Sequence, residues 1–302
     1  MGKRVAVTGS TGLIGDALCR HLVARGDSLV RLVRRPTEAA DERQWDPAQG
    51  LLEPTALEGV DAVVNLGGVG IGDKRWTDEH KKAVEQSRVD ATDTVSRALA
   101  QHLLSTGRRI RLVSGSAVGV YGDRGDEVLT ESSPAGDDFL AGVVQRWEAA
   151  ADPAVDAGLD VALIRTGLVM SRRGGAFEPI LRLARLGLGG PLGSGRQWFP
   201  WITLVDEVRA IVHLLDHPEL SGPFNLAAPG EARQKDVAAA LGRALSRPAI
   251  LPAPRFAIRV VIGEFADSVL ASQRIHPAAL AANGFTFEHP DLSSGVSWLV
   301  EH

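Results

Sequence analysis

Short apolar runs alternate with longer amphipathic segments through most of the chain. The runs lie at residues 5–8, 29–33, 61–66, 110–113, 161–164 and 225–228, and helical periodicity extends over residues 78–105 and 138–157. A strand buried on both faces has a continuous apolar run, and strands that alternate with helices form parallel βαβ units. The pattern therefore predicts an α/β fold built on a Rossmann-type, doubly wound parallel sheet.

Three glycines follow the first apolar run, at Gly9, Gly12 and Gly15. Gly9 allows a tight turn, Gly12 lets the backbone approach a pyrophosphate, and Gly15 permits close packing of helix on strand. The amphipathic helix that follows points its free amide groups and positive dipole end back at this loop. We therefore predict a dinucleotide site here, against the alternative of an ordinary glycine-rich turn. The predicted contacts are Gly9, Ser10, Thr11, Gly12, Leu13 and Ile14.

Arg34 distinguishes between the two nicotinamide cofactors. It lies 19 positions after Gly15, where NAD-binding folds carry an acid that binds the ribose 2′-hydroxyl. A cation at this position can instead pair with a 2′-phosphate, so the sequence predicts NADP(H), with Arg35 assisting. The alternative is a solvated pair of arginines before Pro36.

Polar and glycine residues also follow the other predicted strands. Because the carboxyl ends of parallel strands meet at one edge of the sheet, we expect these residues to line a single crevice. The predicted cofactor contacts there are Leu66, Gly67, Gly68, Ser114, Arg165 and Gly167.

Residues 187–200 are rich in glycine and proline and have neither helical nor strand periodicity. A long irregular loop inside a compact chain is usually functional. Aromatic and basic side chains can grip a planar or anionic substrate, and we predict this role for Arg75, Trp76, Trp198 and Trp201. The alternative for the two later tryptophans is an ordinary structural role.

The chain changes character after residue 228. An amphipathic helix is predicted over 235–246, a proline-rich turn follows, and further helices are expected within 255–282. We expect residues 1–170, joined by 203–228, to form the dinucleotide-binding domain. Residues 171–202 and 229–302 are expected to form a smaller, discontinuous substrate lobe at the C-terminal side.

Composition limits the classes of function. The chain has 302 residues, 44% hydrophobic and 23% charged, with a net charge of −4, which is typical of a soluble globular protein and excludes general nucleic-acid binding. Cys19 is the single cysteine, so internal disulfides and thiolate metal clusters are excluded. No run is long enough to span a membrane and no signal peptide precedes the first strand, so we expect a cytoplasmic protein without a membrane partner.

Several motifs together resemble a known superfamily. The segments at residues 8–15, 65–68 and 114–122 are similar to those of extended and atypical short-chain dehydrogenases/reductases, the group that contains nucleotide-sugar epimerases. Residues 75–77, 87–89, 147–148, 165–167, 187–195, 197–202, 251–254 and 284–287 resemble one atypical subfamily of epimerase-like, NAD(P)-binding oxidoreductases of unknown substrate. The resemblance implies a C-terminal extension and adds Arg88 to the cofactor contacts. The chain departs from the pattern at Gly67, where the family usually has Ala, and at Gly115.

The usual proton relay of this superfamily is missing. Its members use a Tyr and a Lys four residues later, with a Ser that polarises the substrate oxygen. Tyr121 is the single tyrosine and is followed four positions later by Gly125. Counting back from Glu148, the two relay positions fall at Leu140 and Val144, which are apolar and transfer no proton.

Three polar residues are candidates for the missing chemistry. We predict that Ser116 hydrogen-bonds the substrate carbonyl, although its hydroxyl could instead cap a strand end. Tyr121 is the second predicted catalytic residue, as a proton donor, with packing beside the substrate as the alternative. Glu148 follows Trp147 in an amphipathic helix, which favours a structural role.

Two other chemistries are rejected. His213 and His217 have the i, i+4 spacing of a metal pair, but no third ligand accompanies them, so no metal site is predicted. A serine hydrolase needs Gly-x-Ser-x-Gly, and Ser116 lacks the first of these glycines.

The sequence therefore predicts an NADP(H)-dependent, epimerase-like oxidoreductase for a small polar carbonyl or a sugar-nucleotide-like compound. The alternative is a non-catalytic NADPH-binding sensor or scaffold, because the relay is absent. The substrate and the oligomeric state are left open.

Overall fold

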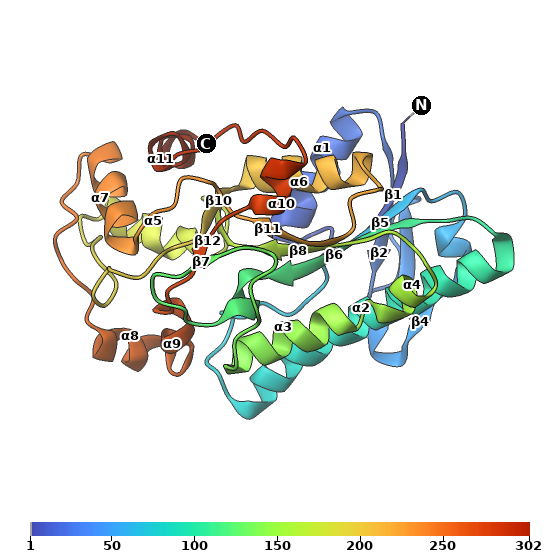
Figure 1. Ribbon diagram of the computed structural model, residues 1–302, viewed down its shortest axis with the longest axis horizontal. Helices are drawn as coiled ribbons and strands as arrows, with labels where there is room; N and C mark the ends of the chain where they lie inside the picture. The colour runs from blue at the N-terminus through green and yellow to red at the C-terminus, as the bar shows by residue number, and fades with distance from the viewer. Residues whose placement is uncertain (1) are drawn as a thin grey trace.

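A computed structural model describes residues 2–302 and contains an eight-stranded sheet (Figure 1). The strand order is β11-β8-β6-β5-β1-β2-β3-β4, and all neighbours are parallel except β4, which is antiparallel to β3. The doubly wound Rossmann-type sheet predicted from the apolar runs is confirmed. The strands are β1 (Arg4–Thr8), β2 (Ser28–Val33), β3 (Glu42–Asp46), β4 (Leu51–Leu52), β5 (Ala62–Asn65), β6 (Arg111–Ala117), β8 (Val161–Thr166) and β11 (Gly222–Leu226).

Helices cover both faces of the sheet. In Figure 1, α1 (Leu13–Ala24) and α6 (Leu204–Asp216) lie above it, and α2 (Asp78–Thr106), α3 (Phe139–Ala149) and α4 (Asp152–Asp156) lie below it. The single helix expected over 138–157 is two helices, because Pro153 has no N–H to donate and its ring clashes with the preceding turn.

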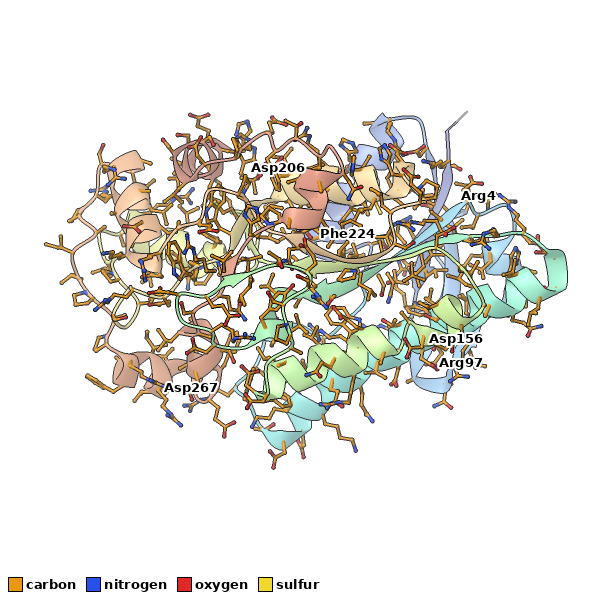
Figure 2. The ribbon with its side chains drawn as sticks, in the orientation of Figure 1. Arg4, Arg97, Asp156, Asp206, Phe224 and Asp267 are labelled. Atoms are coloured by element: carbon orange, nitrogen blue, oxygen red, sulfur yellow. The ribbon has the colours of Figure 1, made fainter. Side chains whose placement is uncertain are left out.

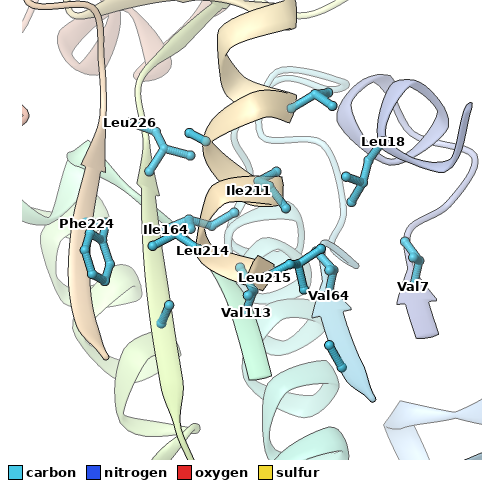
Figure 3. Packing of buried hydrophobic residues seen from close by; sticks show 14 of the residues in the cluster. Val7, Leu18, Val64, Val113, Ile164, Ile211, Leu214, Leu215, Phe224 and Leu226 are labelled. Carbon is cyan, nitrogen blue, oxygen red and sulfur yellow. The ribbon is translucent and has the colours of Figure 1, made fainter. Parts of the chain in front are cut away.

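The sheet separates two hydrophobic clusters, which explains the continuous apolar runs. Val7 faces α1 and α6, where it joins Leu18 and Ile211 (Figure 3). Val5 belongs to the same cluster, whereas Ala6 faces α2 and α4. Successive side chains of a strand point to opposite faces, so both faces of these strands must be apolar.

The strand order reverses at β1, which lies between β5 and β2. Thr8 at the end of β1 pairs with Asn65 of β5, and Asn65 pairs with Ser114 of β6. Parallel sheets of this kind bind ligands outside the carboxyl ends of the strands at such a switch point. The predicted cofactor loop is therefore at the position where the topology favours a ligand.

The remaining elements lie outside the main sheet. They include a third hydrophobic cluster built on α5 (Phe177–Arg185), α7 (Gln234–Ala244) and α11 (Leu292–Glu301). Two short strand pairs are β9 (Leu168–Met170) with β10 (Trp201–Thr203) and β7 (Val128–Leu129) with β12 (Arg274–Ile275). The other helices are α8 (Arg255–Ile262), α9 (Phe265–Val269) and α10 (Ala278–Ala282). The 3-10 helices are η1 (Pro47–Gln49), η2 (Pro54–Leu57) and η3 (Val118–Tyr121). The expected domain boundaries stay predictions. Across residues 2–302, no helix is both long and apolar enough for a membrane crossing.

Two acidic residues at the start of α6 differ in their surroundings. Asp206 accepts hydrogen bonds from the backbone N–H groups of Glu288 and His289, at 2.8 and 2.9 Å, and thereby ties the C-terminal segment to α6 (Figure 2). Glu207 is fully buried, and its Oε1 accepts one hydrogen bond, 2.7 Å long, from Thr166 Oγ1. Glu207 Oε2 has no partner within residues 2–302. Burial raises the pKa of Glu207 from 4.5 to about 8, with the Thr166 hydrogen bond opposing the rise.

This burial predicts a pH dependence of stability. Between pH 4.5 and about 8 the folded chain holds a proton on Glu207 that the unfolded chain releases, so the free energy of unfolding contributed by this group falls as the pH rises. Glu207→Gln, which resembles the protonated acid, should gain stability relative to the parent protein on going from pH 5 to pH 8, by on the order of a few kcal/mol. Urea denaturation at both pH values measures this difference, and an equal difference at the two would show that Glu207 does not titrate as described.

Candidate active site

The glycine loop between β1 and α1 packs too tightly for other residues. Gly9 has a φ of +63°, and a Cβ there would lie 2.7 Å from the carbonyl oxygen of Leu66. A Cβ on Gly15 would lie 2.1 Å from the carbonyl oxygen of Gly9. The helix begins after Gly12, which provides no side-chain cap. The first-turn amides therefore remain free to donate to a phosphate.

Thr8 connects this loop to the end of β5. Its Oγ1 accepts hydrogen bonds from the backbone N–H groups of Leu66 and Gly67, both 2.9 Å long, and donates to Asn65 Oδ1 at 2.8 Å. These contacts hold Leu66 and Gly67 beside the loop. Ser114, by contrast, is fully buried and accepts a hydrogen bond from Asn65 Nδ2, so its side chain faces the interior instead of the cofactor crevice.

The two arginines after β2 have different environments. Arg35 donates two hydrogen bonds to Glu42, at 2.7 and 3.0 Å, and these bonds lower the pKa of the buried Glu42 to about 2. Arg34 is exposed at the end of β2 and has no hydrogen-bond or ion-pair partner among residues 2–302. Arg35 is thus paired with Glu42, and Arg34 is the arginine of this pair without a partner in residues 2–302. That Arg35 assists stays a prediction.

Ser116, Glu148 and Arg165 form one polar network at the ends of β6 and β8. Ser116 Oγ donates to Glu148 Oε1 at 2.5 Å, and Arg165 Nε and Nη2 donate to the two carboxylate oxygens at 2.8 and 2.9 Å. Burial lowers the pKa of Arg165, but the hydrogen bond and charge of Glu148 outweigh burial and raise it. Arg165 is therefore engaged with Glu148, and its predicted contact with the cofactor stays a prediction.

Tyr121 is joined to the same network but is sealed inside the protein. Its hydroxyl donates to Asn225 Oδ1 at 2.7 Å and accepts from Arg165 Nη1 at 2.9 Å. The side chain is fully buried, and burial raises its pKa above the usual value. Such a phenol has neither access to a substrate nor a reason to lose its proton, so the predicted role of proton donor is not supported.

The two relay positions on α3 are used for packing. A Cβ on Gly119 in η3 would lie 3.7 Å from Leu140 and 4.0 Å from Val144, so both side chains contact this turn. Val144 is 4% exposed. Nothing polar replaces the Tyr and Lys at these positions, and Glu148, one turn beyond Val144 on α3, carries the nearest acid on that helix.

Trp147 explains why residue 115 is glycine. A Cβ on Gly115 would lie 2.9 Å from Trp147 Cζ2 and 3.1 Å from the carbonyl oxygen of Asn65. Trp147 Nε1 donates to Thr92 Oγ1 at 3.0 Å, which fixes the ring against the strand. The departure from the family pattern at Gly115 therefore accommodates this indole. At Gly167, a Cβ would lie 2.5 Å from the carbonyl oxygen of Pro200, so close backbone packing requires glycine there too.

The predicted substrate residues separate into two groups. Trp76 stacks on Phe265 at 5.3 Å, contacts Phe139 edge-on at 5.2 Å, and donates from Nε1 to the carbonyl oxygen of Ile71. Arg75 Nη2 donates to the carbonyl oxygen of Val260 at 2.9 Å. These two residues lie where the start of α2 meets α8 and α9.

Trp198 and Trp201 both have partners within the protein. The guanidinium groups of Arg233 and Arg274 lie 4.4 and 4.7 Å from the Trp198 ring, and its Nε1 donates to Asp126 Oδ1. Trp201 is 1% exposed and donates from Nε1 to the carbonyl oxygen of Gly230. Trp201 is therefore a core residue, which corrects the expectation that it contacts the substrate. Trp198 is only half-buried, so its predicted substrate contact stays a prediction.

Asn225 is a member of the network that the sequence analysis missed. It lies in the otherwise apolar β11, accepts from Tyr121, and donates from Nδ2 to the carbonyl oxygen of His276. An amide inside an apolar run was the available signal. The rings of His213 and His217 are 4.3 Å apart, and no group of three metal-binding side chains occurs among residues 2–302.

The contact between Gly115 and Trp147 generates a stability prediction. Gly115→Ala should lower the free energy of unfolding by about 1–3 kcal/mol, because the indole and the strand cannot both keep their positions. Gly119→Ala is the matched control, since a Cβ there meets only ordinary contacts of 3.7 Å or more. Thermal or urea unfolding measures both variants, and equal stabilities would contradict this account of Gly115.

Comparison with known proteins identifies the family. Residues 5–227 match the NAD dependent epimerase/dehydratase family, and residues 253–299 match a domain of unknown function, DUF1731. An epimerase family protein of Mycobacterium leprae is 41% identical over 295 residues, which cover 97% of this chain and 94% of the relative. Epimerase family protein SDR39U1 of Homo sapiens is 35% identical over 301 residues, which cover 98% of this chain and 99% of the human protein.

Solved structures agree with this assignment. The crystal structure of human SDR39U1 (isoform 2) with NADPH has a TM-score of 0.89 at 34% identity and covers 99% of both chains. UDP-N-acetylglucosamine 4-epimerase from Bacillus cereus has a TM-score of 0.75 at 17% identity over 98% of both chains, a likeness of fold alone. The resemblance predicted from the motifs is confirmed, and the chain belongs to the NAD dependent epimerase/dehydratase family of NAD(P)-binding proteins.

Proposed function

We propose that this protein is an NADP(H)-dependent, epimerase-like oxidoreductase that acts on a small polar carbonyl or sugar-nucleotide-like compound. The observation that carries the proposal is the 2.5 Å hydrogen bond from Ser116 to Glu148, at the edge of the sheet where β1 leads into the glycine loop. The human relative crystallised with NADPH supports the choice of cofactor.

The described residues fit a bound NADP(H). The glycine loop leaves no room for a side chain at Gly9 or Gly15, and the free amides of α1 suit a pyrophosphate. Arg34 would hold the 2′-phosphate, because its guanidinium has no competing partner among residues 2–302. When bound, the nicotinamide supplies or accepts a hydride.

Ser116 and Glu148 provide a route for the accompanying proton. In oxidation of an alcohol, Ser116 Oγ accepts the hydroxyl proton of the substrate and passes its own proton to Glu148 Oε1. In reduction, Glu148 first takes up a proton from solvent, Ser116 donates its proton to the oxygen of the new alcohol, and Ser116 then regains a proton from Glu148. Arg165 fixes the carboxylate through two hydrogen bonds, so Glu148 keeps the geometry that the transfer needs.

The second candidate is a sensor or scaffold that binds NADPH without turnover. The apolar side chains of Leu140 and Val144 and the burial of Tyr121 favour it, because the usual relay has no direct substitute at its own positions.

A cytoplasmic location remains a prediction from the sequence.

Arg34 should determine the choice between NADPH and NADH. Arg34→Ala should weaken NADPH binding by about 10- to 100-fold, because it removes a charge-assisted contact to the 2′-phosphate, and should leave NADH binding nearly unchanged. Titration of cofactor fluorescence measures both affinities. Arg35→Ala is the matched control, and a larger loss there than in Arg34→Ala would contradict the assignment.

Ser116 should be required for turnover. Against a panel of aldehydes, ketones and nucleotide sugars, the parent protein should oxidise NADPH with at least one compound, and Ser116→Ala should lower kcat/KM for it by about 100- to 1,000-fold. Glu148→Gln should also lower kcat/KM, and the loss should be larger for alcohol oxidation, in which Glu148 accepts the proton. Glu85→Gln, which removes a carboxylate paired with Arg146 on the surface, is the control. Full activity of Ser116→Ala would refute the proposed role, and NADPH binding without oxidation by any compound would favour the sensor.

A further inference from the structure

Arg88 occupies a site shaped around its guanidinium group. It extends from α2 toward the segment after β5, where Nη1 donates to the carbonyl oxygens of Val69 and Val84, both at 2.9 Å. On one side the guanidinium lies 5.1 Å from the centre of the Trp147 ring. On the other side a Cβ on Gly68 would lie 3.3 Å from Arg88 Cγ and 3.4 Å from its Cζ. The absence of a side chain at residue 68 therefore makes room for this cation.

One edge of this guanidinium is open. Nε and Nη2 have no hydrogen-bond partner within residues 2–302, and neither is among the buried polar atoms sealed from solvent. Arg88 makes no ion pair in that range, although the charge of Asp73 acts on it. Burial of part of the guanidinium lowers the pKa of Arg88, and the charge of Asp73 opposes this shift.

The open edge consists of the same two nitrogens through which other arginines of this protein pair with its own carboxylate side chains. Arg165 binds Glu148 through Nε and Nη2, and Arg31 binds Asp41 through the same two nitrogens. Two parallel N–H groups on one edge match the two oxygens of a planar carboxylate. In Arg88 this edge is vacant, whereas Nη1 is already used.

A second buried arginine shows what a purely structural role looks like. Arg111 donates to the carbonyl oxygens of Pro218 and Leu220, and its Nε is sealed from solvent at the amino end of β6. A ligand has no access to it. Arg88 lies instead at the carboxyl end of the sheet, and the Trp147 ring on which it stacks also contacts Gly115, the neighbour of Ser116.

We propose that the Nε–Nη2 edge of Arg88 binds a carboxylate group of the substrate. The inference rests on the proposed function and narrows it, because it assigns a substrate that carries an anionic group as well as the carbonyl or hydroxyl that meets Ser116. Arg88 then fixes the substrate through a part that does not react, and this binding energy orients the reacting carbon. In this account Arg88 is a substrate-specificity residue, a role that differs from the cofactor contact implied by the family resemblance.

Calorimetric titration with small anions tests the inference. Oxalate should bind the NADPH-saturated protein, and oxamide, its uncharged analogue, should not. Arg88→Met keeps an apolar side chain against Trp147 but removes the charge, so it should weaken oxalate binding by about 10- to 100-fold. Arg97→Met is the matched control, because Arg97 lies on the same helix, is exposed and pairs with Asp93 (Figure 2). It should leave oxalate binding unchanged.

The outcomes separate this inference from the proposed function. If inorganic phosphate binds more tightly than oxalate, Arg88 favours a tetrahedral anion, and the proposal of a substrate carboxylate is overturned. No oxalate binding, or equal binding by the parent protein and Arg88→Met, would overturn the inference itself. NADPH titration of the same samples does not depend on oxalate binding. If the parent protein does not bind NADPH, the proposed function is refuted instead. Arg88→Lys, which keeps the charge without the paired N–H groups, should bind oxalate with intermediate affinity and covers the case in which Arg88→Met does not fold.

Discussion

The ion pair between Arg165 and Glu148 is the interaction on which the candidate site depends. Their side chains are 11% and 14% exposed, and the pair joins the end of β8 to α3. Removing one partner of such a pair costs about 3–5 kcal/mol, because the other charge stays buried and uncompensated, whereas the intact pair stabilises the fold little. Its main effect is therefore positional. Ser116 donates to the carboxylate and Tyr121 accepts from the guanidinium, so strands β6 and β8 and the turn η3 are held in one arrangement.

The residues that suit cofactor binding follow the family pattern, whereas the residues expected to transfer the proton do not. The glycine loop and Arg34 keep the features of a dinucleotide site, but the α3 positions that would carry the proton relay pack against η3 as Leu140 and Val144. The last turn of α3 provides the polar chemistry instead. Glu148 faces Ser116, and Trp147, one residue earlier, faces Gly115 and Arg88. One helical turn thus supports both the proposed proton route and the proposed anion contact.

The sequence predicted those parts of the protein that local patterns determine. Continuous apolar runs predicted the parallel strands, because both faces of the sheet are buried, and glycine spacing predicted the loop at residues 9–15. Contacts between residues distant in the chain were not predictable in this way. Arg35 pairs with Glu42 of the next strand, and the Trp198 ring contacts Arg233 and Arg274, partners that no local spacing reveals. The short strands β9, β10, β7 and β12 have two or three residues each, too few to show a period.

The central claim is that Ser116, held by Glu148 and Arg165, contacts the reacting oxygen in place of the missing relay. The most direct measurement is a crystal structure of the complex with NADPH and a substrate identified by the panel. The account predicts the substrate oxygen within hydrogen-bond distance of Ser116 Oγ, the Ser116–Glu148 hydrogen bond intact, and the Tyr121 hydroxyl still bound to Asn225. A substrate oxygen that contacts another titratable group while Ser116 remains turned toward Glu148 alone would contradict it.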